Sequence, residues 1–494
     1  MASNLLILVP EIAVVTIVAV LALLEIFLPP HPPLSPLGGE RIKGEGGNLF
    51  FLKHAVNFVG IIFVALALVR VFTRTGTAFD GMFVSDPFAV FFKLIFLGTA
   101  AAVFLMSGAK EAEFHLLLWS TLLGMFFLVS SNNFLLFFVS LELLTLSLYI
   151  LAAWSKQDLL SIEAGLKYLV LGSLASAFLL YGISLIYASS GTISFEELGK
   201  FVGARLVPAR EGQTQGLPLL FQAGVLLVLS ALGFKVASVP FHVWVPDVYE
   251  GAPTPVVAFF SVASKSAGFA ALLRVLFTAL AGWGGERRVL FSLFAAMTLL
   301  YGNLGALVQT DMKRLLGYSS IGHAGFLLIA LAARPEAATA LLYYLIAYAV
   351  THLSVFLVVS VVENSDGSHT IAAFKGLARR SPFLGAGMFV ALLSLAGVPP
   401  LGGFFAKFFI LLSAARSGLF WLVILGAINV AVSLYYYLSV VRVVYFEKPA
   451  RDSLVAVSFP LALLLTGLLI AIVLVGVWQP PFFRAASLAA LSIQ

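Results

Sequence analysis

Apolar segments of about 20 residues follow one another along almost the whole chain, which is the length that a helix needs to cross a bilayer. A water-soluble fold could not bury so many of them. We predict about 14 membrane spans, at residues 5–28, 54–74, 86–108, 114–131, 133–154, 161–190, 218–244, 253–281, 289–309, 314–333, 336–361, 383–413, 417–446 and 454–478. The sequence therefore predicts an all-α polytopic membrane protein with a single integral membrane domain over residues 1–494.

The composition agrees with this fold and excludes several functions. Hydrophobic residues make up 61% of the chain and charged residues only 11%, against roughly 25% charged residues in soluble domains. The net charge is +6, but no dense basic run occurs that could follow phosphates, so nucleic acid is not an expected partner. The absence of cysteine excludes disulfides, thiolate-bound iron–sulfur clusters and cysteine-ligated zinc. We expect no metal in this chain, and any redox chemistry must belong to a partner.

The segment 29–53 is the longest polar interruption near the N-terminus, and it is rich in proline and glycine. That composition is typical of a flexible, solvent-exposed loop. The segment is too short for a separate domain, and the sequence assigns it no role.

Glu142 is the most unusual charge in the chain. It lies in the middle of a predicted span, and no other charged residue occurs between Asn133 and Trp154. An ionisable group at the bilayer centre costs at least ~2.5–3.5 kcal/mol and usually marks function. The alternative is a neutral, hydrogen-bonded carboxyl group with a structural role.

Three lysines also lie within apolar spans, each in a span of its own: Lys235, Lys265 and Lys407. Small residues surround Lys265, which permits close helix packing and leaves room for water. Lys265 lies near the middle of its span, beyond easy snorkelling to the surface. The alternative for each lysine is a purely structural counterion.

Prolines next to two of these lysines predict broken helices. Pro240 follows Lys235, and the pair Pro399 and Pro400 precedes Lys407. Proline removes a backbone donor and clashes with the preceding turn, and broken membrane helices occur where they line a cavity or an ion site. The two breaks are about 160 residues apart, which hints at two internal repeats.

Four further residues are secondary candidates. Lys167 lies near the start of its span and could instead snorkel to the surface. His242 follows Pro240 and could bond the interrupted backbone. His323 and His352 are intramembrane histidines that could carry protons near neutral pH, although a lone buried histidine is more often structural. None of them shows the spacing of a metal site.

One acid and three lysines on different spans favour a proton path over a substrate transporter, which would more often show a shaped polar pocket. A lysine can hold or release a proton as the charge of its neighbours changes. Such a path needs no redox centre in this chain. A scaffold whose charges only hold helices together is the structural alternative.

Several motifs resemble the antiporter-like membrane subunits of respiratory complex I, the proton-pumping NADH–quinone oxidoreductase, and among them the N-type subunits. The motifs cover nearly the whole chain: VPEI near the start, SDPFAVFFK at 85–93, SLELLTLSLYILAA at 140–153, GLKYLVLGSLASAFLLYG at 165–182, GFKVASVPFHVWVPDVYEGAPTPV at 233–256, DMKRLLGYSSIGHAG at 311–325 and LAGVPPLGGFFAKF at 395–408. A lysine at position 407 resembles the N-type, whereas a glutamate there would suggest the M-type.

The resemblance implies two inverted five-helix repeats, about 114–281 and 289–446, each with a broken helix. It implies that Glu142 is the partner of Lys235, that Lys265 connects the two halves, that Lys407 is the terminal lysine, and that Lys167 belongs to the first half-channel. It also implies a proton-translocating subunit of an enzyme in which quinone reduction occurs elsewhere. NADH, FMN, iron–sulfur clusters and quinone would then lie in partner subunits.

The expected partners are the other membrane subunits of complex I, including other antiporter-like subunits, and the lipid bilayer. The expected location is the bacterial inner membrane, which the chain crosses several times. Two relatives share these motifs and remain as alternatives: a subunit of a multi-subunit Na⁺/H⁺ antiporter and a membrane subunit of a hydrogenase complex.

Overall fold

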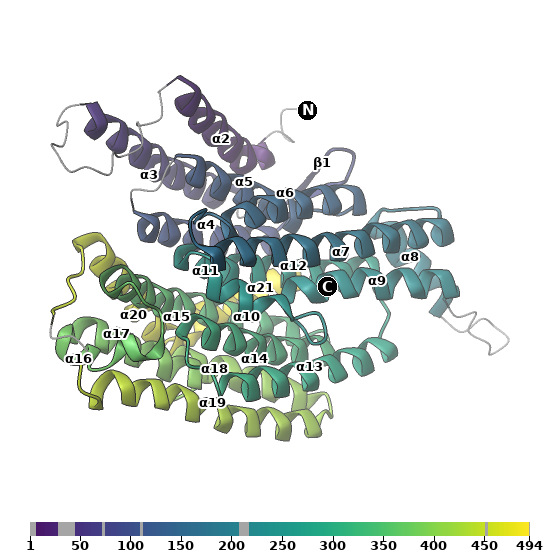
Figure 1. Ribbon diagram of the computed structural model, residues 1–494. Coiled ribbons are helices and arrows are strands. Elements are labelled where there is room, and N and C mark those ends of the chain that lie inside the picture. Colours follow the sequence, from purple (N-terminus) through teal and green to yellow (C-terminus); the bar gives the residue numbers. More distant parts are fainter. Residues whose placement is uncertain are drawn as a thin grey trace.

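The computed structural model describes residues 6–27, 45–71, 75–108, 112–206, 217–449 and 453–493, and helices make up nearly all of them (Figure 1). The predicted loop 29–53 falls largely on residues 28–44, which lie outside the described residues. Its predicted end was wrong, because the chain is helical again from Glu45.

The helices follow the predicted spans in order. They are α2 (Val9–Phe27), α3 (Glu45–Val71), α4 (Pro87–Ser107), α5 (Ala112–Val129), α6 (Phe134–Ala152), α7 (Leu159–Ser190), α8 (Phe195–Leu206), α9 (Leu219–Val236), α10 (Trp244–Gly251), α11 (Thr254–Phe259), α12 (Lys265–Arg274), α13 (Gly285–Ala306), α14 (Met312–Ala332), α15 (Ala337–Asp366), α16 (Leu377–Arg380), α17 (Pro382–Ala396), α18 (Gly402–Arg416), α19 (Phe420–Phe446), α20 (Phe459–Val477) and α21 (Gln479–Leu491). Within the described parts of the chain, 11 helices are long and apolar enough to cross a membrane, and three shorter apolar helices lie at 55–71, 113–129 and 382–396. The polytopic all-α fold is therefore confirmed.

Several short elements were not predicted. Strands β1 (Gly76–Ala78) and β2 (Phe83–Ser85) form an antiparallel hairpin between α3 and α4. Helix α8 occupies part of the predicted loop 191–217, and α21 follows the last predicted span. These elements are short, so a search for 20-residue apolar segments does not find them.

Both predicted helix breaks are present, and they have the same shape. Helix α9 ends at Val236, and Ala237 takes a left-handed conformation with φ of 62°. Helix α17 ends at Ala396, and Gly397 follows with φ of 89°. The prolines at 240 and 400 come three residues after these positions, before α10 and α18 begin. The first break begins slightly earlier than predicted, because helix α9 ends at Val236, four residues before Pro240.

A second repeated feature lies at the start of α6 and of α14. Asn133 caps α6 and forms an isolated β-bridge with Ser194, which follows α7. Asp311 caps α14 and forms the equivalent bridge with Thr370, which follows α15. By our count, five membrane crossings separate the two caps, so they lie on opposite faces of the membrane. An odd number of crossings is what an inverted repeat requires.

The segment Thr254–Ala279, which contains α11 and α12, lies in the middle of the bundle, and its apolar window is completely buried. Helices α14 and α15 are almost as buried, whereas α7 and α20 expose most of their surface. Figure 1 shows α14 and α15 in the interior and α19 at the edge of the bundle. Charges on α12, α14 and α15 are therefore held away from lipid.

Candidate functional site

Glu142 and Lys235 lie on neighbouring helices, but they do not form the direct ion pair that we expected. Lys235 Nζ donates a hydrogen bond to Thr145 Oγ1 at 2.6 Å, one helical turn from Glu142. Glu142 Oε1 accepts a hydrogen bond from Ser176 Oγ of α7 at 2.5 Å. Among the ion pairs of the described residues, none with N···O within 4.0 Å joins Glu142 to Lys235. The Thr145 hydroxyl therefore accepts the hydrogen bond from Lys235 that we expected the Glu142 carboxylate to accept.

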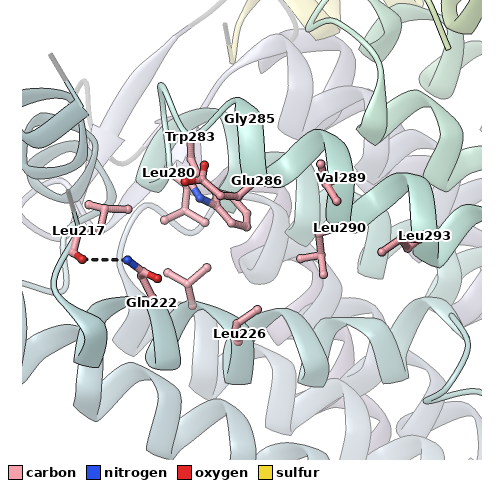
Figure 2. Close-up of a pocket in the computed structure, with 11 residues that line it drawn as sticks. Leu217, Gln222, Leu226, Leu280, Trp283, Gly285, Glu286, Val289, Leu290 and Leu293 are labelled. Carbon is pink, nitrogen blue, oxygen red and sulfur yellow. Dashed lines mark hydrogen bonds between the residues drawn. The ribbon is translucent and has the colours of Figure 1, made fainter. Parts of the chain in front are cut away.

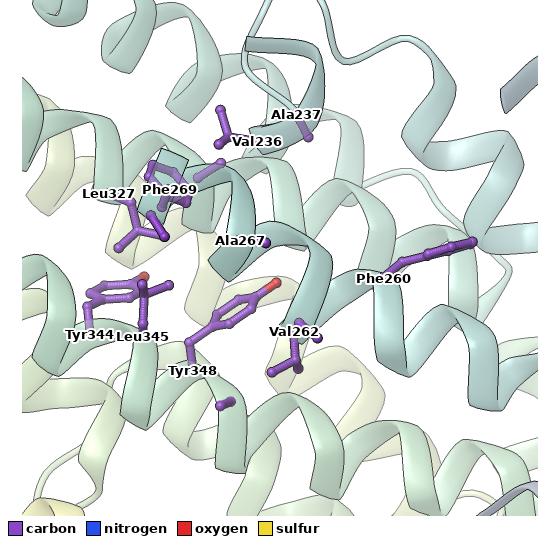
Figure 3. Packing of buried hydrophobic residues seen from close by; sticks show 14 of the residues in the cluster. Val236, Ala237, Phe260, Val262, Ala267, Phe269, Leu327, Tyr344, Leu345 and Tyr348 are labelled. Carbon is purple, nitrogen blue, oxygen red and sulfur yellow. The ribbon is translucent and has the colours of Figure 1, made fainter. Parts of the chain in front are cut away.

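Helix α12 approaches Lys235 closely because residue 268 is glycine. A Cβ atom at Gly268 would lie 2.9 Å from Val236 Cγ1 and 3.3 Å from Lys235 Cβ. The first distance is shorter than atoms tolerate, so only glycine permits this contact. Gly268 is one turn after Lys265, and the contact therefore places Lys235 beside the helix that carries the second lysine. Figure 3 shows Val236 and Ala237 packed near Phe269 and Ala267 of α12.

Lys265 is the first residue of α12, and a π-helical turn, η2 (Phe260–Ser264), precedes it. Turns of this kind are rare in proteins, and those that do occur often lie at functional sites. Lys265 is 3% exposed, and its Nζ donates to the main-chain oxygen of Ser320 at 2.5 Å and to the Ser320 hydroxyl. The lysine thus joins the first half of the chain to α14 in the second half.

A network of hydroxyl groups continues from Ser320. The Ser320 hydroxyl contacts the hydroxyls of Tyr249 at 3.1 Å and of Tyr348 at 3.2 Å. Tyr348 in turn contacts Ser261 at 3.2 Å, and Ser261 lies 2.9 Å from His352 Nδ1. In Figure 3 the ring of Tyr348 reaches from α15 toward η2 and α12. His352, a secondary candidate, therefore connects to Lys265 through hydroxyl groups.

His323 lies next along this line. Its ring centroid is 5.5 Å from that of His352, and its Nδ1 lies 2.5 Å from the hydroxyl of Tyr344. Its Nε2 lies 3.2 Å from the hydroxyl of Tyr437. The structure therefore brings both intramembrane histidines to one place between Lys265 and the second broken helix.

Lys407 binds the second break directly. Its Nζ donates to the main-chain oxygens of Leu395 at 2.7 Å and Ala396 at 3.0 Å, the last two residues of α17. These carbonyls lose their helical partners where the helix ends, and a cation is favourable at a helix C-terminus. At the first break, the indole of Trp244 donates to the oxygen of Phe234 at 3.1 Å. The two breaks thus share their shape but satisfy their free carbonyls with different donors, one charged and one neutral.

The other two secondary candidates lie apart from this line. Lys167 is 41% exposed and forms ion pairs with Glu163 at 2.7 Å and Asp247 at 2.6 Å, so it belongs to a charged cluster near the ends of α7, α10 and α14. His242 is buried at the first break, and its ring lies against Tyr301 with centroids 4.1 Å apart. Neither nitrogen of His242 meets the geometric criteria for a hydrogen bond within the described structure, so its bond to the interrupted backbone stays a prediction.

Four buried cations that we did not single out as candidates are ion-paired. Lys93 contacts Glu11 at 2.5 Å, Arg274 contacts Asp86 at 2.6 Å, Lys313 contacts Glu363 at 3.3 Å, and Arg380 contacts Asp366 at 2.7 Å. One of these pairs, Lys93 with Glu11, connects the motifs VPEI and SDPFAVFFK, and Asp86 and Lys313 also lie in quoted motifs; this was the only signal in the sequence. These four cations each have a carboxylate partner, which distinguishes them from Lys235, Lys265 and Lys407.

One large cavity lies apart from the candidate site. A cavity of about 790 Å³ lies between α9 and α13 near their first turns, and its walls are mainly apolar (Figure 2). Glu286, Gln222 and Trp283 are at its edge, and Gln222 Nε2 donates to the oxygen of Leu217 at 2.9 Å. None of the candidate residues lines this cavity. The candidate site is therefore a chain of side chains inside the bundle.

The sequence and the fold both match known proteins. A sequence-family profile described as "NADH:quinone oxidoreductase/Mrp antiporter, TM" matches residues 131–433. NADH-quinone oxidoreductase subunit N of Moorella thermoacetica is 40% identical over 423 residues, which are 83% of this chain and 86% of that protein.

Two solved structures extend the comparison. A chain of respiratory complex I from Thermus thermophilus has a TM-score of 0.79 and 32% sequence identity, and the match covers 97% of this chain and 99% of that chain. A chain of the Mrp complex from Dietzia has a TM-score of 0.85 but only 19% identity, with coverage of 99% and 98%. The likeness to the Mrp chain is therefore one of fold alone.

Proposed function

Because this chain belongs to the subunit N family of NADH-quinone oxidoreductase, we propose that it moves protons through a relay formed by Glu142, Lys235, Lys265 and Lys407. It is a multi-pass membrane subunit of an oxidoreductase and translocase complex. The relay residues are our proposal, and the contacts of their side chains support it.

The observation that carries the proposal is the isolation of the three lysines from acids. Lys235, Lys265 and Lys407 are at most 6% exposed, and among the described residues none of them has a carboxylate within 4.0 Å. Each ammonium group donates to neutral oxygen atoms instead. An amine in such a place is free to exchange its proton when the charge on a neighbour changes, whereas an amine in a tight ion pair is not.

The order of the relay residues in space supports a path that runs along the bundle from Glu142 to Lys407. Glu142 and Lys235 lie at the first break, and the glycine contact at residue 268 leads to Lys265. Ser320, the tyrosine hydroxyls and the two histidines lead on from Lys265. Lys407 ends the line at the second break. His323 and His352 are proposed as intermediate carriers, because their rings lie between the second and third lysines.

The two breaks are proposed as the elements that gate the relay, one in each inverted repeat of about 114–281 and 289–446. The shared break geometry and the shared β-bridges at Asn133 and Asp311 support this division. The break at Pro240 adjoins Lys235, and the break at Pro399 and Pro400 supplies the carbonyls that bind Lys407.

The energy for proton movement would come from partner subunits. We propose that NADH, FMN, the iron–sulfur clusters and quinone are bound there and not by this chain, in which no cysteine is available as a cluster ligand. The other membrane subunits, including further antiporter-like chains, are the proposed contacts within the membrane. The bacterial plasma membrane is the proposed location.

Substitution of Lys265 tests the relay. Lys265→Arg keeps the charge but holds its proton under nearly all conditions. Quinone-driven proton uptake into membrane vesicles, normalised to the amount of assembled complex, should therefore fall in both Lys265→Arg and Lys265→Ala. Lys200→Ala is the control, because Lys200 is 72% exposed and pairs only with Glu196 at the surface. Full proton uptake by Lys265→Arg would show that the position needs only a fixed charge.

A further inference from the structure

Four arginines gather on one face of the membrane domain, where α13 begins and where α14 and α18 end. They are Arg287, Arg288, Arg334 and Arg416. In the portion of the chain that the structure describes, none of the four has a carboxylate within 4.0 Å, unlike the buried arginines at 274 and 380. Three of them are exposed and Arg287 is half-buried. The cluster therefore carries positive charge that the described chain does not neutralise.

Main-chain hydrogen bonds hold this cluster together. Arg288 Nη2 donates to the oxygen of Ser417 at 2.9 Å, and Arg287 Nη2 donates to the oxygen of Ala333 at 3.2 Å. The amide of Arg334 donates to Ser417 Oγ at 3.0 Å. The turns at 333–334 and 416–418 are thereby fixed to the first turn of α13. Each guanidinium retains further N–H groups, since it carries five donors.

A cavity of about 240 Å³ opens beside the cluster, and both Arg334 and Arg416 line it. Its other walls are largely apolar and come from α15, α18 and α21: Ala337, Ala340, Phe409, Leu412 and Phe483. Glu336 is the one carboxylate among its lining residues, and it pairs with neither arginine within 4.0 Å. Thr339, Ser413 and Ser417 also line the cavity, which thus combines two guanidinium groups that lack a carboxylate partner in the described chain with a largely apolar wall.

We propose that this cavity binds an anionic phospholipid of the surrounding bilayer. The lipid phosphate would lie between Arg334 and Arg416, whose planar N–H groups match phosphate oxygens. Part of an acyl chain would pack on Phe409, Leu412 and Phe483. The apolar walls favour a lipid over a soluble anion, and basic pockets between membrane helices are known places for anionic headgroups. The proposal does not depend on the proton relay.

The test uses the whole complex purified in detergent and stripped of lipid. Phosphatidylglycerol and phosphatidylcholine with identical acyl chains are added back, and the lipids that remain bound after washing are counted by native mass spectrometry. The double variant Arg334→Gln/Arg416→Gln should retain phosphatidylglycerol about tenfold less well than the natural protein, with no change for phosphatidylcholine. Arg379→Gln/Arg442→Gln is the matched control, because Arg379 of α16 and Arg442 near the end of α19 are exposed and do not line the cavity.

A second variant separates the cavity from the charge. Leu412→Trp fills the apolar part and leaves all four arginines in place, and it should also reduce retention of phosphatidylglycerol. Equal retention by both variants and the natural protein would overturn the proposal. Displacement of the lipid by millimolar inorganic phosphate would point to a soluble anion instead. Unchanged lipid retention together with loss of a neighbouring subunit would identify the face as a subunit contact, and this result would also overturn the proposal.

Discussion

Lys265 of α12 donates a hydrogen bond to the main-chain oxygen of Ser320 on α14 at 2.5 Å, and a second bond to the hydroxyl of the same residue. The two residues are 55 positions apart and belong to different predicted repeats. Both residues are buried. This contact is the point at which the two halves of the proposed relay meet.

Ser320→Ala should lower proton pumping while the complex still assembles. The substitution removes the hydroxyl that joins Lys265 to Tyr249 and Tyr348, and an unsatisfied buried donor costs ~1–3 kcal/mol. The main-chain oxygen still accepts one bond, so the fold should persist. Quinone-driven proton uptake per assembled complex is the measurement. Ser173→Ala is the control, because the Ser173 hydroxyl bonds only its own helix. Unimpaired uptake by Ser320→Ala would remove the hydroxyl network from the proposed path.

Glu142→Gln and Lys235→Ala should each reduce pumping at normal complex levels, to below roughly a tenth if proton transfer at this point is rate-limiting. Since Thr145 lies at the Lys235 ammonium, Thr145→Val should also reduce pumping, although Thr145 carries no charge itself. The same vesicle assay compares the three variants. If Thr145→Val pumps normally while the other two do not, Glu142 and Lys235 act through a direct pair in the working complex.

Arg274→Ala should impair assembly rather than pumping alone. Arg274 donates to both oxygens of Asp86, at 2.6 and 3.1 Å, and to the oxygen of Val129 at 2.7 Å. Removing one partner of a buried ion pair costs ~3–5 kcal/mol, because the other charge stays buried and unpaired. Native gels should therefore show less assembled complex. The double variant Arg274→Met/Asp86→Leu should recover part of this loss, and no recovery would argue against an unpaired charge as the cause.

The pKa of Asp247 allows a prediction of how the stability of the complex depends on pH. Burial alone would raise its pKa, but hydrogen bonds from Lys167 and Arg314 outweigh this effect and lower the pKa below its usual value. A lowered pKa means that the stabilisation is present above the ordinary aspartate pKa and is lost only as the pH falls through the lower folded value.

The difference in melting temperature between the natural complex and Asp247→Asn should therefore stay constant from pH 8 to pH 5. The underlying change in the free energy of unfolding should be small, on the order of 1 kcal/mol or less, because the cluster is about one-third exposed. Lys156→Gln serves as the control, because Lys156 is exposed and does not take part in the ion pairs of Asp247. A difference that shrinks between pH 7 and pH 5 would contradict the lowered pKa.

The positions of the spans and of the breaks followed from the sequence, because they depend on local properties. A long run of apolar residues must cross the membrane or be buried in the protein, and a proline interrupts the helix that contains it. Glu142, Lys235, Lys265 and Lys407 stood out for the same reason, since each is a charge within a long apolar segment. The exact end of α9 could not be predicted, because Ala237 adopts a left-handed conformation that alanine rarely takes.

Which buried charges are paired was decided by the tertiary structure alone. Arg274 and Asp86 are 188 residues apart, and nothing local in either span connects them. Lys93 and Glu11 are equally buried, yet their pairing makes them unlike Lys265, whose partners are hydroxyl and carbonyl oxygens. The sequence determined that these charges enter the membrane. Only the packing of distant helices determined which of them are neutralised there, because an ion pair needs two side chains within about 4 Å.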